Sequence, residues 1–356
     1  MIFFTTVSNI KFFFVFLCLF VAIAMFGFMF MEGKAEEMIL MKENEHYNSL
    51  IVGKEKNVAL IGTSHSASSL SYFSNKEEIL DLAGAYTIPT VMYFKLKHTL
   101  VKVSHLKTLY LEADYHLFYE GPLYTSDRSD RSDGVKRWSA FFEPSSGDVL
   151  GELYAVSKPR FYSIERDTAP ILIKRIIADY LKRLKILSTK NLSSIRPLKK
   201  FSNMCDDDLW SSFINEAKKN IVVDNKYWYD LTKNDKYKAA KGRQTEGFGM
   251  IDNAKLSPLM LDYYQKAIEL AKDNNVSVVL IRNPLPKEYL ESIPENIIND
   301  TDQYLEELEK KYGLDILDYR YFFSDKTEMF YNQDHVNQYG AVEVSQEVRN
   351  HYCNSL

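Results

Sequence analysis

The chain has 356 residues, of which 46% are hydrophobic and 26% are charged, so wholesale disorder is excluded and a substantial core is expected. Its formal net charge is -4. A mildly acidic chain lacks the basic surface that neutralises phosphates, so we expect no nucleic-acid partner. The three cysteines, Cys18, Cys205 and Cys353, are too few for a disulfide framework or a four-cysteine metal site. Because Cys18 lies in an apolar leader, Cys205 and Cys353 are the two that could pair, and the sequence leaves this pairing open.

The amino-terminal segment is strongly apolar. Residues 1–31 contain one charged residue, Lys11, and residues 12–31 contain none. A helix over residues 12–31 would span roughly 30 Å, the thickness of the hydrocarbon core of a membrane. No convincing cleavage site follows Met31, which favours an uncleaved signal anchor over a cleaved signal peptide. Lys11 and the free amino terminus favour an N-inside orientation, which places the body of the protein outside the cytoplasm, periplasmic or extracellular. No second stretch approaches this length without charge, so one crossing is expected.

The body alternates between two kinds of apolar pattern. Residues 32–56 are charged and are expected to form a helical stalk ahead of the domain at 57–356. Short apolar runs predict strands at residues 57–62, 79–84, 107–114, 276–284 and 314–319. Apolar residues at helical spacing predict helices at 90–103, 258–274, 302–312 and 341–352. This alternation predicts an α/β fold of the flavodoxin-like kind, with three layers and a parallel sheet.

Residues 116–256 interrupt the alternation. A polar repeat at 126–134 is expected to be an exposed loop. Residues 171–190 combine an apolar helical face with basic residues, so this helix either lies on a membrane or a membrane partner, or packs on the core as an ordinary surface helix. The region is too long for a structureless loop, and we expect an inserted subdomain that covers the site.

Two residues at one end of the predicted sheet are candidates for nucleophilic catalysis. Ser64 follows a predicted strand that ends at Gly62, and parallel sheets place ligands at the carboxyl ends of their strands. Its hydroxyl would be exposed and its N–H could face an oxyanion, although a serine here could also simply cap a helix. His335 lies between the last predicted strand and the last helix, at the same end. A histidine within hydrogen-bond reach supplies the base that a serine hydroxyl needs.

Together these motifs resemble a known family. Gly62-Thr63-Ser64, Gly84 after the second predicted strand, and a histidine followed by asparagine and glycine near the end are similar to the pattern of SGNH/GDSL-type hydrolases. The resemblance covers residues 57–115 and 257–352. It is closest to the membrane-anchored cell-envelope branch, which includes the D-alanyl transfer protein of teichoic acid synthesis and the O-acetylation proteins of exopolysaccharides such as alginate.

The resemblance implies roles for individual residues. Ser64 would be the nucleophile and His335 the general base, while the N–H groups of Ser64 and Gly84 would form an oxyanion hole. The family's third donor is an asparagine after the third strand, where the nearest match here is Asp114, whose carboxylate cannot donate a hydrogen bond. We expect His65 and Asp114 to contact substrate, with a structural role in the turn as the alternative for His65.

The acid of the triad departs from the family pattern. The family places an acid three residues before the histidine, and this chain has Asn332 there. Asn332 could assist a Ser–His dyad by orienting the imidazole without stabilising its charge. Alternatively, Asp334 or a distant acid substitutes, although the side chain of a residue adjacent to His335 is expected to point away from its ring. In a third interpretation the site is degenerate and the protein is a scaffold.

Two hypotheses about function follow. In the first, the protein is an extracytoplasmic serine-dependent O-acyltransferase or esterase that acts on a cell-envelope glycan and takes its group from an acyl donor. In the second, it is a non-catalytic module that binds glycan or tethers a multi-transmembrane acyltransferase. No cofactor is implied. The other histidines lack metal-ligand spacing such as H-E-x-x-H, so no metal site is expected.

Overall fold

The structure is a computed structural model, and it describes residues 56–74, 78–84, 87–119, 204–221, 226–248 and 250–355. The predicted anchor (1–31), all but the last residue of the stalk (32–56), the polar loop (126–134) and the amphipathic helix (171–190) lie outside these residues and stay predictions. Within the described ranges, no helix has the length and apolar character that a membrane crossing requires. The described residues all belong to one compact unit, Leu50–Leu356.

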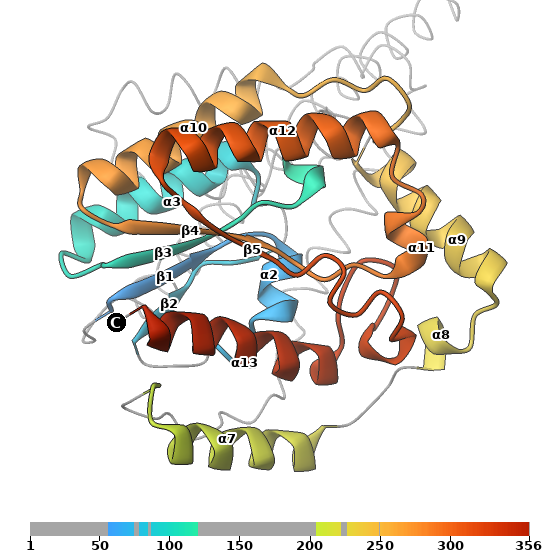
Figure 1. The fold of residues 1–356 in the computed structure, drawn as a ribbon, viewed down its shortest axis with the longest axis horizontal. Helices are drawn as coiled ribbons and strands as arrows, with labels where there is room; N and C mark the ends of the chain where they lie inside the picture. The colour runs from blue at the N-terminus through green and yellow to red at the C-terminus, as the bar shows by residue number, and fades with distance from the viewer. Residues whose placement is uncertain are drawn as a thin grey trace, which may run out of the picture. The chain divides into compact units, whose positions relative to one another are not determined.

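A parallel sheet of five strands forms the centre of this unit, in the order β2-β1-β3-β4-β5 (Figure 1). The strands are β1 (Val58–Ile61), β2 (Ile79–Asp81), β3 (Thr108–Glu112), β4 (Ser277–Arg282) and β5 (Asp315–Asp318). All four residues of β1 are buried, as expected for a central strand with helices on both faces. The five predicted strands and the parallel, flavodoxin-like α/β arrangement are thereby confirmed.

Helices cover the sheet on both faces (Figure 1). One face carries α3 (Pro89–Lys102), α10 (Pro258–Asp273) and α12 (Glu295–Tyr312), and the other carries α2 (Ser64–Ser69) and α13 (Gln338–Asn354). Under α13, Val344 and Val348 share one buried cluster with Val58 of β1. The helix α12 begins earlier than predicted, directly after its N-cap residue Pro294. The missing N–H of this proline costs no helical hydrogen bond, because the first N–H groups of a helix have no helical acceptor. Asn337 begins α13 as a cap, its Oδ1 accepting from the N–H of Tyr339 at 2.9 Å.

The described part of the predicted insertion is helical. It comprises α7 (Asp207–Asn220), α8 (Lys226–Tyr229), α9 (Lys233–Gly242) and a π-helical turn, η3 (Arg243–Phe248). The remaining short elements are α11 (Lys287–Leu290) and the 3-10 turns η1 (Tyr115–Leu117) and η4 (Thr327–Met329).

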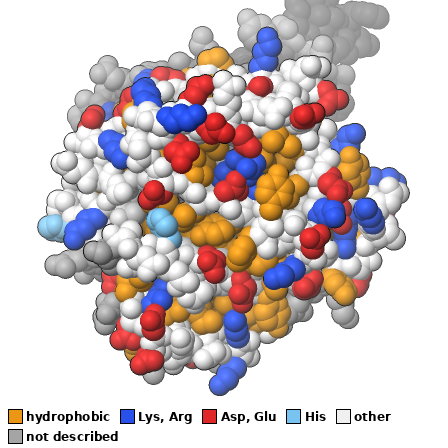
Figure 2. Space-filling model, in the orientation of Figure 1, with side chains coloured by type: hydrophobic (Ala, Val, Ile, Leu, Met, Phe, Trp, Pro, Cys, Tyr) orange, Lys and Arg blue, Asp and Glu red, His pale blue; other side chains and the backbone are white. Residues whose placement is uncertain are grey.

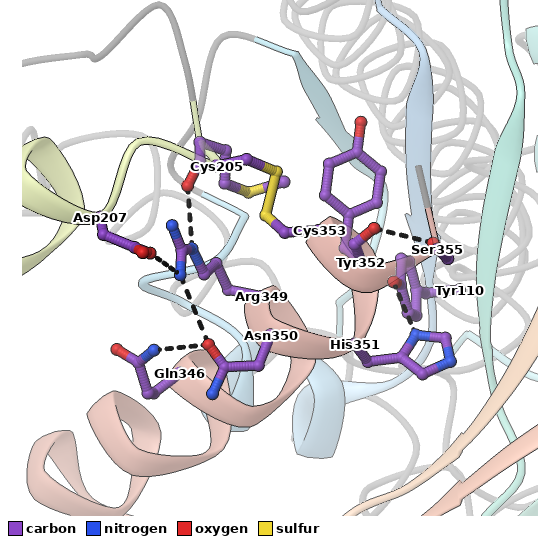
Figure 3. Close-up of a disulfide and its surroundings, with 11 residues drawn as sticks. Tyr110, Cys205, Asp207, Gln346, Arg349, Asn350, His351, Tyr352, Cys353 and Ser355 are labelled. Atoms are coloured by element: carbon purple, nitrogen blue, oxygen red, sulfur yellow. Dashed lines mark hydrogen bonds and ion pairs between the residues drawn. A yellow bond between two sulfur atoms is a disulfide. The ribbon is translucent and has the colours of Figure 1, made fainter.

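A disulfide joins this region to the last helix. Cys205, just before α7, is bonded to Cys353 near the end of α13, with a Cα–Cα distance of 5.4 Å (Figure 3). The pairing that the sequence left open is therefore present. Arg349 of α13 reinforces the junction, because its Nε donates to the carbonyl of Met204 at 2.9 Å and its Nη1 lies 2.6 Å from Asp207 Oδ1. The described end of the insertion is thus fixed to the sheet domain.

The surface of the described part has a mixed character. Acidic and basic side chains are interspersed over the face shown in Figure 2, with apolar side chains between them. This distribution agrees with the small net charge of -4.

Candidate active site

The fold brings Ser64 and His335 into contact. Ser64 is the first residue of α2, just beyond the carboxyl end of β1, and His335 lies in the loop that precedes α13. The Oγ of Ser64 is 2.9 Å from Nε2 of His335, across 271 residues of sequence. Both side chains therefore lie at the edge of the sheet where the sequence predicts them.

Asp334 completes a hydrogen-bonded line with these two residues. Its Oδ1 lies 2.8 Å from Nδ1 of His335. A carboxylate only accepts hydrogen bonds, so Nδ1 carries the proton and the lone pair of Nε2 faces the Ser64 hydroxyl. The order hydroxyl, imidazole, carboxylate is that of a serine triad. The expectation that the Asp334 side chain points away from the ring is wrong.

Asp334 is ionised although it is buried. Only 1% of its surface is exposed, and burial by itself would raise the pKa of the carboxyl. Hydrogen bonds and charge from His335 and His65 outweigh burial and hold the pKa of Asp334 well below its usual range. The group facing His335 therefore carries a negative charge at neutral pH, which suits it to stabilise an imidazolium.

Asn332 shapes the loop that makes this geometry possible. Its Oδ1 accepts from the backbone N–H of His335 at 2.9 Å and of Asp334 at 3.1 Å. Such a turn, closed by an asparagine side chain, folds the backbone back on itself. The same oxygen lies 3.1 Å from Nδ1 of His335, so Asn332 also helps to orient the ring. The charge comes from Asp334, and the second interpretation of the triad acid describes the geometry best.

A buried glutamate anchors the turn that carries Ser64. Glu112, at the end of β3, accepts from the N–H of Thr63 at 2.7 Å and from its Oγ1 at 2.6 Å. It also accepts from the N–H of Ser66 at 3.2 Å. Burial, the largest influence, raises the pKa of Glu112 to about 7. Only glycine fits at position 62, because a Cβ there would lie 2.6 Å from Glu112 Oε2.

His65 and Asp114 lie behind the triad. Each is 2% exposed, and Nδ1 of His65 is 2.8 Å from Asp114 Oδ2. The other oxygen of Asp114 accepts from the N–H of Asn283 at 2.8 Å, and Asn283 Nδ2 donates to Oδ2 at 3.1 Å. Because these polar groups are directed at one another, the prediction that His65 and Asp114 contact substrate is corrected: they support the site from inside the protein.

One of the two predicted oxyanion donors is occupied. The N–H of Gly84 donates to the carbonyl of Gly62 at 2.9 Å, as an extension of the pairing between β1 and β2. The role predicted for Gly84 is therefore corrected. The N–H of Ser64 lies in the first turn of α2 and has no acceptor within the helix, so its oxyanion role stays a prediction.

The inserted region contributes a cation to the site. Arg243, the first residue of η3, donates from Nε to Asp334 Oδ2 at 2.5 Å. Its guanidinium lies 4.6 Å from the ring centre of Phe248 in the same turn. The described end of the insertion therefore reaches the carboxylate of Asp334.

Sequence reasoning missed Glu112, Asn283 and Arg243. The first two had a usable signal, because Glu112 ends a mostly apolar strand and Asn283 directly follows another, as Ser64 follows β1. Arg243 lies far from any motif, in a segment that no pattern connects to the sheet.

Two groups of side chains have the chemistry to ligate a metal ion. They are His65, Glu112, Asp114 and His116, and His65, Asp334 and His335; in each group the ligand atoms lie within 4.8 Å of one another. Most of these atoms already serve in the hydrogen bonds described above. The His116 ring is neutral, because burial holds its pKa well below the ordinary value. The contacts therefore define a hydrogen-bonded network of histidines and carboxylates.

Comparison with known proteins finds a likeness in structure but none in sequence. No family model matches the chain, and no curated protein matches it. A crystal structure from Bacteroides fragilis, described provisionally as an acylhydrolase, is similar over 88% of this chain and 96% of that chain, with a TM-score of 0.37 and 8% identity. A likeness this distant carries no argument about activity, so function is inferred from the site.

Proposed function

We propose that the protein is an extracytoplasmic O-acyltransferase or esterase that modifies a cell-envelope polysaccharide through a serine acyl-enzyme. The observation that carries the proposal is the continuous line Ser64–His335–Asp334, with hydrogen bonds of 2.9 Å and 2.8 Å. A serine hydroxyl becomes a useful nucleophile when a base accepts its proton and a third group orients that base.

The geometry supports double displacement. Ser64 Oγ attacks the acyl carbonyl while its proton passes to Nε2 of His335, and Asp334 stabilises the imidazolium. The Ser64 N–H faces the developing oxyanion. Collapse of the intermediate breaks the bond to the donor's alcohol, which takes the proton from His335. A sugar hydroxyl or water then gives its proton to His335 and attacks the acyl-serine. The bond between the acyl group and Ser64 Oγ breaks, His335 returns the proton to Oγ, and the acylated sugar or the free acid leaves.

Two features support a location outside the cytoplasm. The apolar segment 12–31 is long enough for an anchor. The disulfide between Cys205 and Cys353 is of a kind that persists in oxidising compartments and is rare in the cytosol. An enzyme anchored there meets envelope glycans. A multi-transmembrane acyltransferase is a candidate partner that would deliver an acyl donor through the membrane. Such a supply of donor would favour transfer of the acyl group over hydrolysis.

The acid at Asp334 favours the enzyme over the non-catalytic module. The scaffold interpretation depends on Asn332 standing where the family has an acid, and Asp334 fills that role from the adjacent position. A fold alone does not choose between these alternatives, so the choice depends on the site.

The test is an acyl-transfer assay with the full chain in detergent. The protein is incubated with p-nitrophenyl acetate and O-deacetylated envelope polysaccharide, and acetate ester on the glycan is measured against free acetate. The proposal predicts wild-type turnover that disappears in Ser64→Ala. Equal turnover in wild type and Ser64→Ala, or none in either, would overturn it.

A further inference from the structure

A buried histidine joins the catalytic carboxylate to the sheet. Nδ1 of His65 is 2.8 Å from Asp114 Oδ2, and its Nε2 is 3.5 Å from Asp334 Oδ2. Both ring nitrogens therefore face carboxylate oxygens, which only accept hydrogen bonds. A neutral imidazole carries one N–H and would leave one of these carboxylates facing a lone pair. The geometry is satisfied by a ring that is protonated at both nitrogens.

The surroundings of the ring agree with a positive charge. Burial lowers the pKa of His65, but hydrogen bonds and charge from Asp114 and Asp334 outweigh it and raise the pKa to about 10. The other titratable groups close by are His116 and His335, whose ring centres are 4.5 Å and 5.0 Å away. Glu112 of β3 adds a further acidic group, and Arg243 of η3 reaches the same Asp334 oxygen.

Asp334 divides its two oxygens between different tasks. Oδ1 faces His335, while Oδ2 faces Arg243 at 2.5 Å and His65 at 3.5 Å. A carboxylate that is adjacent in sequence to its imidazole partner needs support to stay on the ring. His65 supplies that support from the interior. Its own position is fixed by Asp114, which in turn accepts hydrogen bonds from the N–H and Nδ2 of Asn283.

The position of His65 in the sequence links both ends of the triad. Ser64 and His65 are consecutive residues of α2. Ser64 contacts Nε2 of His335, and His65 contacts the carboxylate that holds Nδ1. One helical turn therefore positions the nucleophile and the acid relative to the same imidazole.

We propose that His65 is a positioning residue, an imidazolium shared by Asp114 and Asp334 that holds the Asp334 carboxylate on His335. This inference rests on the proposed function, because it assigns His65 a part in the activation of Ser64. It extends the line Ser64–His335–Asp334 inward by two positioning residues, His65 and Asp114.

The experiment measures the rate at which a fluorophosphonate probe labels Ser64, from pH 6 to pH 10. His65→Gln keeps a neutral hydrogen-bonding side chain, and we expect its labelling to be about tenfold to hundredfold slower, as is typical for a misplaced catalytic group. His105→Gln replaces an exposed histidine and serves as the matched control, with a wild-type rate expected.

Asp114→Asn separates the charge of His65 from a general loss of structure. Without the Asp114 carboxylate, the effect of burial lowers the pKa of His65, so the ring loses its proton at a lower pH than in the wild type. Labelling of this variant should fall at alkaline pH, where the wild type still reacts. A purely structural defect would slow labelling equally at every pH, and that result would overturn the proposal.

Nitrogen NMR of histidine-labelled protein reads the charge directly and does not require activity. The signal absent from His65→Gln identifies residue 65, and we expect both of its nitrogens to be protonated from pH 6 to pH 9. A neutral ring at pH 7, free or metal-bound, would overturn the proposal. A wild type that does not label at all overturns the proposed function, whereas equal labelling of wild type and His65→Gln overturns only the role of His65.

Discussion

Replacement of Asp334 by asparagine tests the arrangement of the triad. Both oxygens of Asp334 face donors, with Oδ1 toward His335 Nδ1 at 2.8 Å and Oδ2 toward Arg243 Nε at 2.5 Å. An asparagine has one oxygen, so its NH2 group must face one of these donors. If it faces His335, the ring adopts the tautomer with a proton on Nε2, which cannot accept the proton of Ser64.

The size of the effect follows from this loss of both tautomer and charge. Comparable substitutions in serine triads lower turnover by about 10³- to 10⁴-fold, which is about 4–5.5 kcal/mol of transition-state stabilisation. We expect Asp334→Asn to lose activity toward p-nitrophenyl acetate by that factor, measured by initial rates on protein whose folding is checked by circular dichroism. The change should appear in kcat and leave KM nearly constant, because Asp334 is buried and does not reach substrate.

Asn332→Ala is the matched comparison. It removes the Oδ1 that accepts from two backbone N–H groups and lies 3.1 Å from Nδ1, but it leaves the carboxylate in place. We expect a loss of activity of at most about tenfold and a destabilisation of about 1–2 kcal/mol. If Asn332→Ala loses about 10³-fold or more while Asp334→Asn stays within about threefold of the wild type, the site is an asparagine-assisted dyad and Asp334 is not the acid of a triad.

Three further predictions concern the support of the site. Gly62→Ala places a Cβ 2.6 Å from both Glu112 Oε2 and Ser66 Oγ, so we expect fluorophosphonate labelling of Ser64 to slow by about a hundredfold. The control Gly242→Ala, whose Cβ meets nothing within 4 Å, should label at the wild-type rate. Equal rates for the two variants would contradict the tight packing of the turn at Gly62. Burial raises the pKa of Glu112 from 4.5 to about 7, so the folded state holds a proton there that the unfolded state has released, and stability from this group falls as pH rises from 4.5 to 7. Glu112→Gln does not titrate, so its free energy of urea unfolding should change less between pH 4.5 and pH 7 than that of the wild type, and an identical change would disprove the assignment. The double variant Cys205→Ser and Cys353→Ser opens a link across 148 residues, and we expect it to lose about 2–5 kcal/mol of stability in denaturant unfolding. Its activity should persist, because Cys353 lies at the far end of α13 from His335, and loss of activity in the folded variant would count against this separation.

The sheet and the contact between Ser64 and His335 were predictable from the sequence for a simple physical reason. Buried parallel strands are short apolar runs, and the β1 run of Val58–Ile61 is followed at once by the turn that carries Ser64. Because the carboxyl ends of parallel strands share one edge, a histidine between the last strand and the last helix meets that serine.

The acid and its supports were not predictable in the same way. The orientation of Asp334 depends on the turn closed by Asn332 and on contacts from His65 and Arg243, which come from distant parts of the chain. Spacing along the sequence contains no information about such contacts. Gly84 shows the same limit, because the donation of its N–H to Gly62 depends on the register of two strands.

The most direct test of Ser64 as an activated nucleophile is covalent labelling of the full-length protein with a fluorophosphonate probe, followed by peptide mass spectrometry. We predict one adduct, on Ser64, which is absent in Ser64→Ala and strongly slowed in His335→Ala. No adduct on the folded wild type, or an adduct that persists in Ser64→Ala, would contradict the claim that Ser64 is an activated nucleophile.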